Sequence, residues 1–266
     1  GFGLAGALLA LSPGSTNLLF VADAITFALA AAIVYGIPNL GGGSKTTPVL
    51  GALKRTWSIL ATRQHLVVGT LASFLLPISY PALLALAYNV TCSSADPQCA
   101  SGGQAYSGLE VVLTAGVLAG SILVGRFGAI GTMRTVGSGL MLTGIFSVAI
   151  TVIAYAFGTG GSLVIVIGLA LFIASIGNPI YAVGNQTALL EAADPRNRAS
   201  VMATRFGMVQ TASIIGTAVG GLITKEAGPL AAYGVLGIGL VVLAMYTIAA
   251  GRSTTNPLHG AAYEEA

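Results

Sequence analysis

The chain has 266 residues, of which 55% are hydrophobic and only 7% are charged, and its formal net charge is +3. A soluble domain carries charge on roughly a quarter of its positions, so this composition excludes an ordinary soluble fold and indicates an integral membrane protein. The basic excess is not a sign of nucleic-acid binding, because ten of the eleven Lys and Arg residues fall on one side of the apolar stretches. We therefore expect the lipid bilayer, and no nucleic acid, as a partner.

The apolar stretches predict transmembrane helices. The first, from Gly1 to about Leu11, is too short to cross a bilayer, so we expect the chain to begin partway through a longer protein. Seven full-length stretches follow, at 18–37, 66–90, 109–126, 136–157, 163–189, 200–224 and 229–250. Each is close to the ~20 residues that a helix needs to cross hydrocarbon, and none alternates as barrel strands do. The predicted fold class is all-α, with about eight transmembrane helices.

Basic residues alternate along the connections between these stretches. Ten of them lie in the connections 38–65, 126–135 and 190–205 and in the tail that starts near 252. The connections 12–17, 91–108 and 158–162 hold none, and 225–228 holds Lys225 only. Because basic loops stay on the cytoplasmic side, we expect a multi-pass protein of the plasma membrane with the basic loops and the tail 253–266 in the cytoplasm.

The two cysteines, Cys92 and Cys99, share one of the loops expected to face outward. Disulfides persist in oxidising compartments, so a bond between them is expected there; two free thiols are the alternative. Neither histidine nor a cluster of carboxylates accompanies the cysteines, and we expect no metal and no cofactor.

The last six stretches suggest an internal repeat. They follow the connection 38–65 and divide into two groups of three, 66–157 and 163–250, with opposite orientations, as in an inverted-topology repeat. The opening stretch of each group contains proline: Pro77 and Pro81 in the first, Pro179 in the second. Proline removes a backbone donor and bends a helix, and paired broken helices point to a transport site. Proline tolerated for packing alone is the alternative.

Several segments resemble a known family. Asn185–Leu190 and Asp194–Phe206 together resemble the junction of the tenth and eleventh helices in major facilitator superfamily transporters, closest to the branch of enterobactin and macrolide exporters. Phe20–Phe27 is similar to the start of that branch's sixth helix. The run from Gly120 through Arg126 to Gly128 looks like a degenerate copy of the superfamily's inner-loop motif, with Gly125 where an acid often stands.

The resemblance implies a domain organisation. It makes 1–37 the end of the N-terminal bundle (helices five and six), 38–65 the cytoplasmic central loop, 66–252 the C-terminal six-helix bundle and 253–266 a cytoplasmic tail. The missing N-terminal bundle of the same chain is then a partner. The family implies a secondary active transporter that works by alternating access, commonly an antiporter for efflux of small amphiphilic compounds such as drugs or siderophores in exchange for H⁺. Helices seven, eight, ten and eleven would face the pathway.

Uncharged polar residues are the candidates for the substrate pathway. Asn178, Tyr181, Asn185 and Gln186 share one stretch, and Gln210 lies near the middle of the next. Asn178, Tyr181 and Asn185 fall on one helical face, at i, i+3 and i+7. Hydrogen bonds to a substrate and hydrogen bonds between helices are equally compatible with this pattern.

Charged residues in the apolar stretches are candidates for structural roles or for proton coupling. Asp23 is the carboxylate furthest inside a stretch, and we favour a structural hydrogen bond for it over proton coupling. Glu110 begins its stretch at the outer interface, where proton coupling is the alternative to simple hydration. Arg205 lies about one turn into its helix, where it either snorkels to the cytoplasm or meets an anionic lipid or substrate.

The remaining patterns indicate packing and exclude common enzymes. Gly116 and Gly120, like Gly216 and Gly220, have the GxxxG spacing that allows close helix contact. Histidine occurs only at His65 and His259, which we place in the central loop and the tail. Without a metalloprotease, P-loop or nucleophile-elbow motif, we expect no enzyme activity. A non-transporting polytopic protein, such as a lipid-modifying enzyme or an assembly factor, remains the alternative to a transporter.

Overall fold

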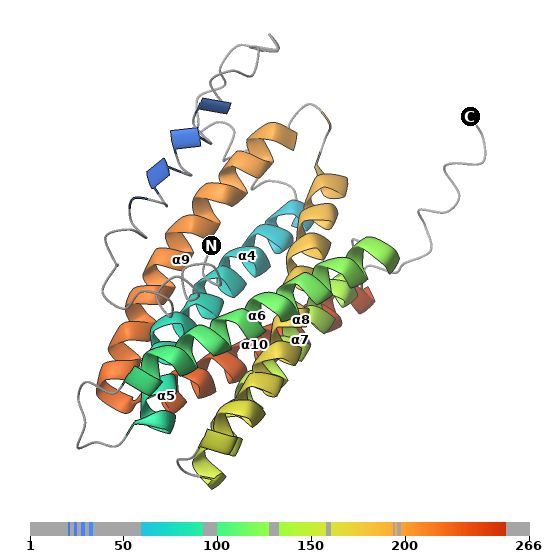
Figure 1. The fold of residues 1–266 in the computed structure, drawn as a ribbon. Helices are drawn as coiled ribbons and strands as arrows, with labels where there is room; N and C mark the ends of the chain where they lie inside the picture. Colours follow the sequence, from blue (N-terminus) through green and yellow to red (C-terminus); the bar gives the residue numbers. More distant parts are fainter. Residues whose placement is uncertain are drawn as a thin grey trace, which may run out of the picture.

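The described part of the chain is helical. The computed structural model describes residues 60–92, 100–127, 133–157, 161–193, 195 and 198–253, with isolated helical positions at 21, 24–25, 28–29 and 32–33. Its elements (Figure 1) are α4 (Leu60–Leu75), the 3₁₀ helix η1 (Leu76–Ile78), α5 (Ser79–Thr91), α6 (Ala100–Phe127), α7 (Met133–Phe157), α8 (Gly161–Ala192), α9 (Arg198–Ala227) and α10 (Pro229–Ser253).

Six spans are long and apolar enough to cross a membrane in this part of the chain. The first combines α4, η1 and α5, and the others are α6, α7, α8, α9 and α10. These six correspond to the last six predicted stretches and fit a multi-pass membrane protein. The predicted stretch 18–37 lies mostly outside the described residues, and so does Asp23.

Two helices begin earlier than the sequence predicts. The stretch expected to begin at residue 109 is preceded by nine further helical residues, because α6 starts at Ala100. Gly102 explains this extension: a Cβ placed there would lie 2.5 Å from Cδ1 of Tyr88, so the bare backbone packs on the ring. Similarly, α4 starts at Leu60, inside the connection 38–65.

Pro77 interrupts the first span, as predicted. It lies in η1 between α4 and α5, and Pro81 follows in the first turn of α5. Because proline lacks an N–H, Pro77 leaves the carbonyl of Ser73 without its helical donor. The hydroxyl of Ser213, on α9, donates to that carbonyl over 3.1 Å. A neighbouring helix therefore replaces the missing bond.

Pro179 does not interrupt its helix, which differs from the prediction of matching breaks. α8 continues from Gly161 to Ala192 with Pro179 inside it. Support comes from α7, since Thr143 donates to the carbonyl of Ala174 over 2.9 Å. A Cβ at Gly139 would lie 2.5 Å from the backbone nitrogen of Tyr181, so the two backbones meet next to the proline. Close packing holds α8 helical through the site.

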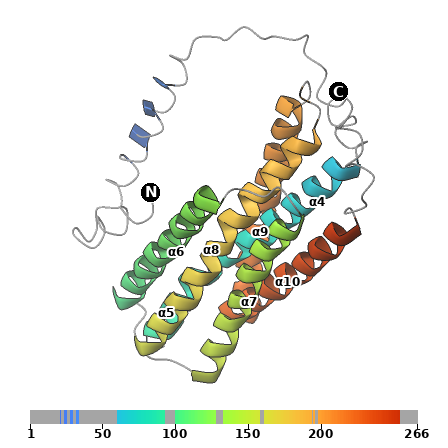
Figure 2. The same ribbon diagram turned by 90° about the vertical axis from the view of Figure 1, so that its right-hand side faces the viewer.

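The helices pack in pairs across the bundle. α7 packs between α8 and α10, α6 packs on α8, and α4 with η1 packs on α9. Figure 2 shows α6 and α10 on opposite flanks of the bundle. The predicted glycine spacings mark two of these contacts. A Cβ at Gly120 would lie 2.5 Å from the carbonyl oxygen of Ile176 on α8, and one at Gly220 would lie 2.6 Å from that of Ile78 in η1.

The contacts also fix the direction of each helix. α6 runs parallel to α8 and α4 parallel to α9, whereas α7 is antiparallel to α8 and α10. One end of the bundle, here called the basic end, therefore carries Arg63, Arg126, Arg134 and Arg198. Cys92 and Lys225 lie at the opposite end.

Candidate functional site

Polar residues of α8 meet α4 inside the bundle. The hydroxyl of Tyr181 donates to the carbonyl of Gly69 over 3.1 Å. A Cβ at Gly69 would lie 2.6 Å from Nδ2 of Asn185. Because Gly69 has no side chain, the Asn185 amide can pack directly against its backbone. Two of the predicted pathway residues, Tyr181 and Asn185, come together here.

Three polar groups at this crossing are buried and lack a hydrogen-bond partner. Asn185 is 0% exposed, and neither its Nδ2 nor its Oδ1 has a well-aligned hydrogen-bond partner, although the His65 ring lies within bonding reach of the amide. His65 is 8% exposed, faces Asn185 and leaves its Nδ1 unpaired. Arg205, on α9, is half-buried as a residue, and its Nε is buried and unpaired. Buried polar groups are nearly always hydrogen-bonded, and each unpaired one costs about 1–3 kcal/mol.

These residues form one site, called here the buried polar cluster and defined as His65, Tyr181, Asn185 and Arg205. The guanidinium of Arg205 lies close enough for its charge to act on the Tyr181 hydroxyl. The placement of His65 corrects the sequence analysis, which assigned it to the central loop. α4 begins before His65 and turns the imidazole into the bundle.

An apolar core closes the basic end next to this cluster. Leu66, Leu189, Ala193 and Val201 are buried together, with Met202 and Met208 packed against them. They come from the same three elements as the cluster and its adjoining turn, namely α4, the end of α8 and the start of α9. The cluster is therefore flanked by apolar packing on the side of the basic end.

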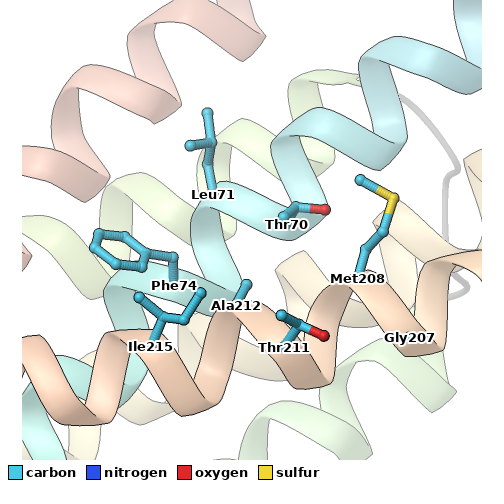
Figure 3. Close-up of a pocket in the computed structure, with 8 residues that line it drawn as sticks. All are labelled: Thr70, Leu71, Phe74, Gly207, Met208, Thr211, Ala212 and Ile215. Carbon is cyan, nitrogen blue, oxygen red and sulfur yellow. The ribbon is translucent and has the colours of Figure 1, made fainter.

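A groove of about 510 Å³ lies on the adjacent faces of α4 and α9. Its walls are largely apolar, and Figure 3 shows the residues that line it: Thr70, Leu71, Phe74, Gly207, Met208, Thr211, Ala212 and Ile215. Thr70 follows Gly69 in the chain, and Met208 lies one turn beyond Arg205. The groove and the buried polar cluster thus share both helices.

The other predicted pathway residues are not buried in the cluster. Asn178 and Gln186 are half-buried on α8. Gln210 is exposed on α9, directly before the groove residue Thr211. Of the predicted inner-loop motif, Gly120 packs against α8, and Arg126 is exposed in the last turn of α6. Gly128 lies outside the described residues.

Glu110 lies deeper along its helix than predicted. Because α6 starts at Ala100, Glu110 is ten residues from the helix start (110 − 100), or about 15 Å along the axis. Its carboxylate accepts a hydrogen bond of 2.9 Å from Tyr106. Its charge also acts on Tyr80 and Tyr233, and the Tyr233 hydroxyl is buried without a partner. Glu110 thus occupies a tyrosine-rich site towards the opposite end of the bundle.

The remaining predicted groups are only partly described. Cys92 is disulfide-bonded, and Cys99, the other cysteine of the chain, lies outside the described residues. Among the residues that the structure describes, no group of three His, Cys, Asp or Glu side chains is placed to hold a metal ion.

The spacing of residues in the sequence does indicate that His65 belongs to a helix, although the predicted stretch began only at residue 66. His65, Gly69 and Ser73 are spaced by four residues, which places them on one helical face. That face is small and polar, unlike the rest of the stretch. Starting the helix before residue 66 would have brought His65 onto it.

No protein-family model matches the chain, and no curated protein or solved structure matches it either.

Proposed function

We propose that the chain belongs to a secondary active transmembrane transporter that works by alternating access. In this proposal it is the C-terminal two-thirds of a major facilitator-type exporter, which moves small amphiphilic compounds such as drugs or siderophores in exchange for H⁺. The observation that carries the proposal is the buried polar cluster beside an apolar groove.

The unpaired groups of the cluster favour a site over a purely structural role. A bundle that used polar residues only to join its helices would pair them, because unpaired groups destabilise the fold. Paired examples occur nearby: Thr143 bonds to Ala174, and Ser213 bonds to Ser73. Asn185, with neither amide atom in a well-aligned hydrogen bond, departs from that pattern. Polar groups next to an apolar wall are the usual arrangement of a small-molecule site.

Matched glycine contacts support an inverted repeat within the six helices. Gly116 and Gly120 pack on α8 near Pro179, and Gly216 and Gly220 pack on α4 and η1 near Pro77. Each pair joins the second helix of one group of three to the first helix of the other group. Exchanging the two groups of three helices converts one pair of glycine contacts into the other, which is the relation expected for repeats of opposite orientation.

The proposal assigns roles to these regions. The groove of α4 and α9 forms one wall of the pathway, which the N-terminal bundle of the same protein completes. The basic end faces the cytoplasm of the cell, by the positive-inside rule, and the membrane is the plasma membrane. Tyr181 and Asn185 contact the substrate from α8.

The direct test is transport by the full-length protein in vesicles, with and without a pH gradient, across a panel of drugs and siderophores. We expect gradient-driven flux of at least one amphiphilic compound. Replacing the groove residue Phe74 by Ala should change which compounds are transported. The matched control is Val152→Ala on α7, which is 59% exposed and away from the groove, and which should leave the profile unchanged. Absence of gradient-driven flux for the whole panel would favour the non-transporting alternative.

A further inference from the structure

We propose that the buried polar cluster is an oxyanion site, which takes a carboxylate or phosphate group at the basic end of the groove. This inference deepens the proposed function, because it names the chemical class of the ligand: an amphiphile with an anionic head. It also has a readout of its own, since binding is measurable without transport.

The cluster offers donors that have no acceptor. Arg205 contributes the buried Nε–H and Asn185 contributes its Nδ2 amide, and neither atom has a well-aligned partner. The His65 ring lies within bonding reach of the Asn185 side chain. Tyr181 already donates to Gly69. A carboxylate or phosphate accepts several hydrogen bonds and donates none when ionised. Such a group can accept hydrogen bonds from Arg205 and Asn185.

The charge of the site also favours an anionic ligand. In the described part of the chain, the ion pair formed joins Lys225 to Glu226, at the opposite end of the bundle. Glu191, further along α8, is exposed on the surface. The positive charge of Arg205 thus has no described carboxylate as counter-ion. Arg205 is half-buried, with its Nε fully buried, and a bound anion would form charge-assisted hydrogen bonds with the guanidinium.

The groove accounts for the apolar part of the ligand. Thr70 and Met208 line it, and they adjoin Gly69 and Arg205 on the two helices. A ligand whose chain lies along Leu71, Phe74 and Ile215 can direct its head towards Arg205. The same chemistry exists in an anionic solute with a hydrocarbon chain and in an anionic phospholipid.

Thermal unfolding of the purified full-length protein tests the site with octanoate as the probe. Ligands that bind the folded state raise its melting temperature with concentration. We expect octanoate to raise it and octanol, which lacks the anionic head, to leave it much less changed. Arg205→Gln should weaken octanoate binding about tenfold or more. The matched control, Arg126→Gln, changes an exposed arginine at the same end and should have no effect.

Asn185→Leu is the second variant, because it removes the amide from a site where the amide has no partner. We expect it to fold with an unchanged or higher melting temperature and to lose octanoate binding. Equal responses to octanoate and octanol would overturn the proposal. So would equal loss of binding in Arg205→Gln and Arg126→Gln.

Nanodiscs identify the source of the anion. If phosphatidylglycerol, compared with phosphatidylcholine, stabilises the wild type but not Arg205→Gln and weakens octanoate binding, the site takes a lipid headgroup. If phosphatidylglycerol has no effect and octanoate binds, the site takes a solute. Octanoate binding without flux of any compound would leave the oxyanion site standing and refute the transporter.

Discussion

At the scale of single residues, buried polar groups of this bundle fall into two kinds. Thr143 and Ser147 are buried and donate to backbone carbonyls over 2.9 and 2.8 Å. Asn185 and His65 are buried with unpaired atoms. The Ser147 bond lies within α7, and the Thr143 bond joins α7 to α8. Hydrogen bonds between membrane helices are worth only about 0.6 kcal/mol on average, so the Thr143 bond adds modestly to stability. The unpaired groups oppose it, which is the behaviour expected if the proposed site binds a ligand.

Glu110 provides a residue-scale prediction about coupling. If its carboxyl exchanges the coupling proton, Glu110→Gln should abolish the response of flux to a pH gradient, because an amide takes up no proton at physiological pH. Gln keeps an oxygen that can accept the bond from Tyr106, so folding should change little. The measurement is flux in vesicles with and without the gradient.

The control for this experiment is Glu191→Gln, at an exposed position near the end of α8. It should retain gradient dependence. Full gradient dependence in Glu110→Gln would move the coupling acid to another part of the protein.

At the scale of helices, proline and glycine act together. Pro77 removes a donor from α4, and Ser213 on α9 replaces it. The same two elements meet at Gly216 and Gly220, where the missing side chains allow α9 to reach the backbone of α4 and η1. The interrupted span is thus stabilised by a helix that carries both the donor and the small surface.

Gly220→Ala tests this contact. A Cβ there would lie 2.6 Å from the Ile78 carbonyl oxygen, and that backbone cannot move aside as a side chain would. Overpacking typically costs about 1–3 kcal/mol, more than the helix propensity of about 1 kcal/mol that Ala gains over Gly. We expect a lower melting temperature, measured in detergent.

The control is the adjacent Gly221→Ala, where nothing lies within 4 Å of the new Cβ. It should be neutral or slightly stabilising. If both variants unfold at the same temperature, the contact between α9 and η1 is not a close one.

At the scale of the whole molecule, the two ends of the bundle differ in charge. Arg63, Arg126, Arg134 and Arg198 lie at the basic end, and Lys225 lies at the other, paired with Glu226 over 3.5 Å. The polar cluster lies towards the basic end, and Glu110 with its tyrosines lies towards the opposite end. In the proposed transporter, the proposed anion site and Glu110, the candidate coupling acid, are therefore separated along the membrane normal.

Labelling of single cysteines tests this arrangement. In a background with Cys92→Ser and Cys99→Ser, a membrane-impermeant maleimide applied to intact cells should label Lys225→Cys. It should label Arg126→Cys only after the membrane is permeabilised, because the two positions lie at opposite ends. Labelling of both in intact cells would contradict the predicted topology.

Much of the fold follows from local properties of the sequence. Length and hydropathy predicted six spans that the structure describes, because crossing hydrocarbon imposes about 20 apolar residues on each. Helix starts were less accurate: Gly102 and its neighbours look like a loop until Tyr88 of another helix packs on them. The predicted break at Pro179 is absent from α8 because contacts with α7 hold the helix together.

The sequence by itself determined the spans, the alternation of basic connections and the small helix faces, since each depends on neighbours along one helix. Only the tertiary structure decided which polar residues meet. His65, Asn185 and Arg205 come from three helices, and their lack of partners becomes visible only when α4, α8 and α9 are packed together. Helical periodicity orders residues around one axis, whereas a site between helices depends on how several axes cross.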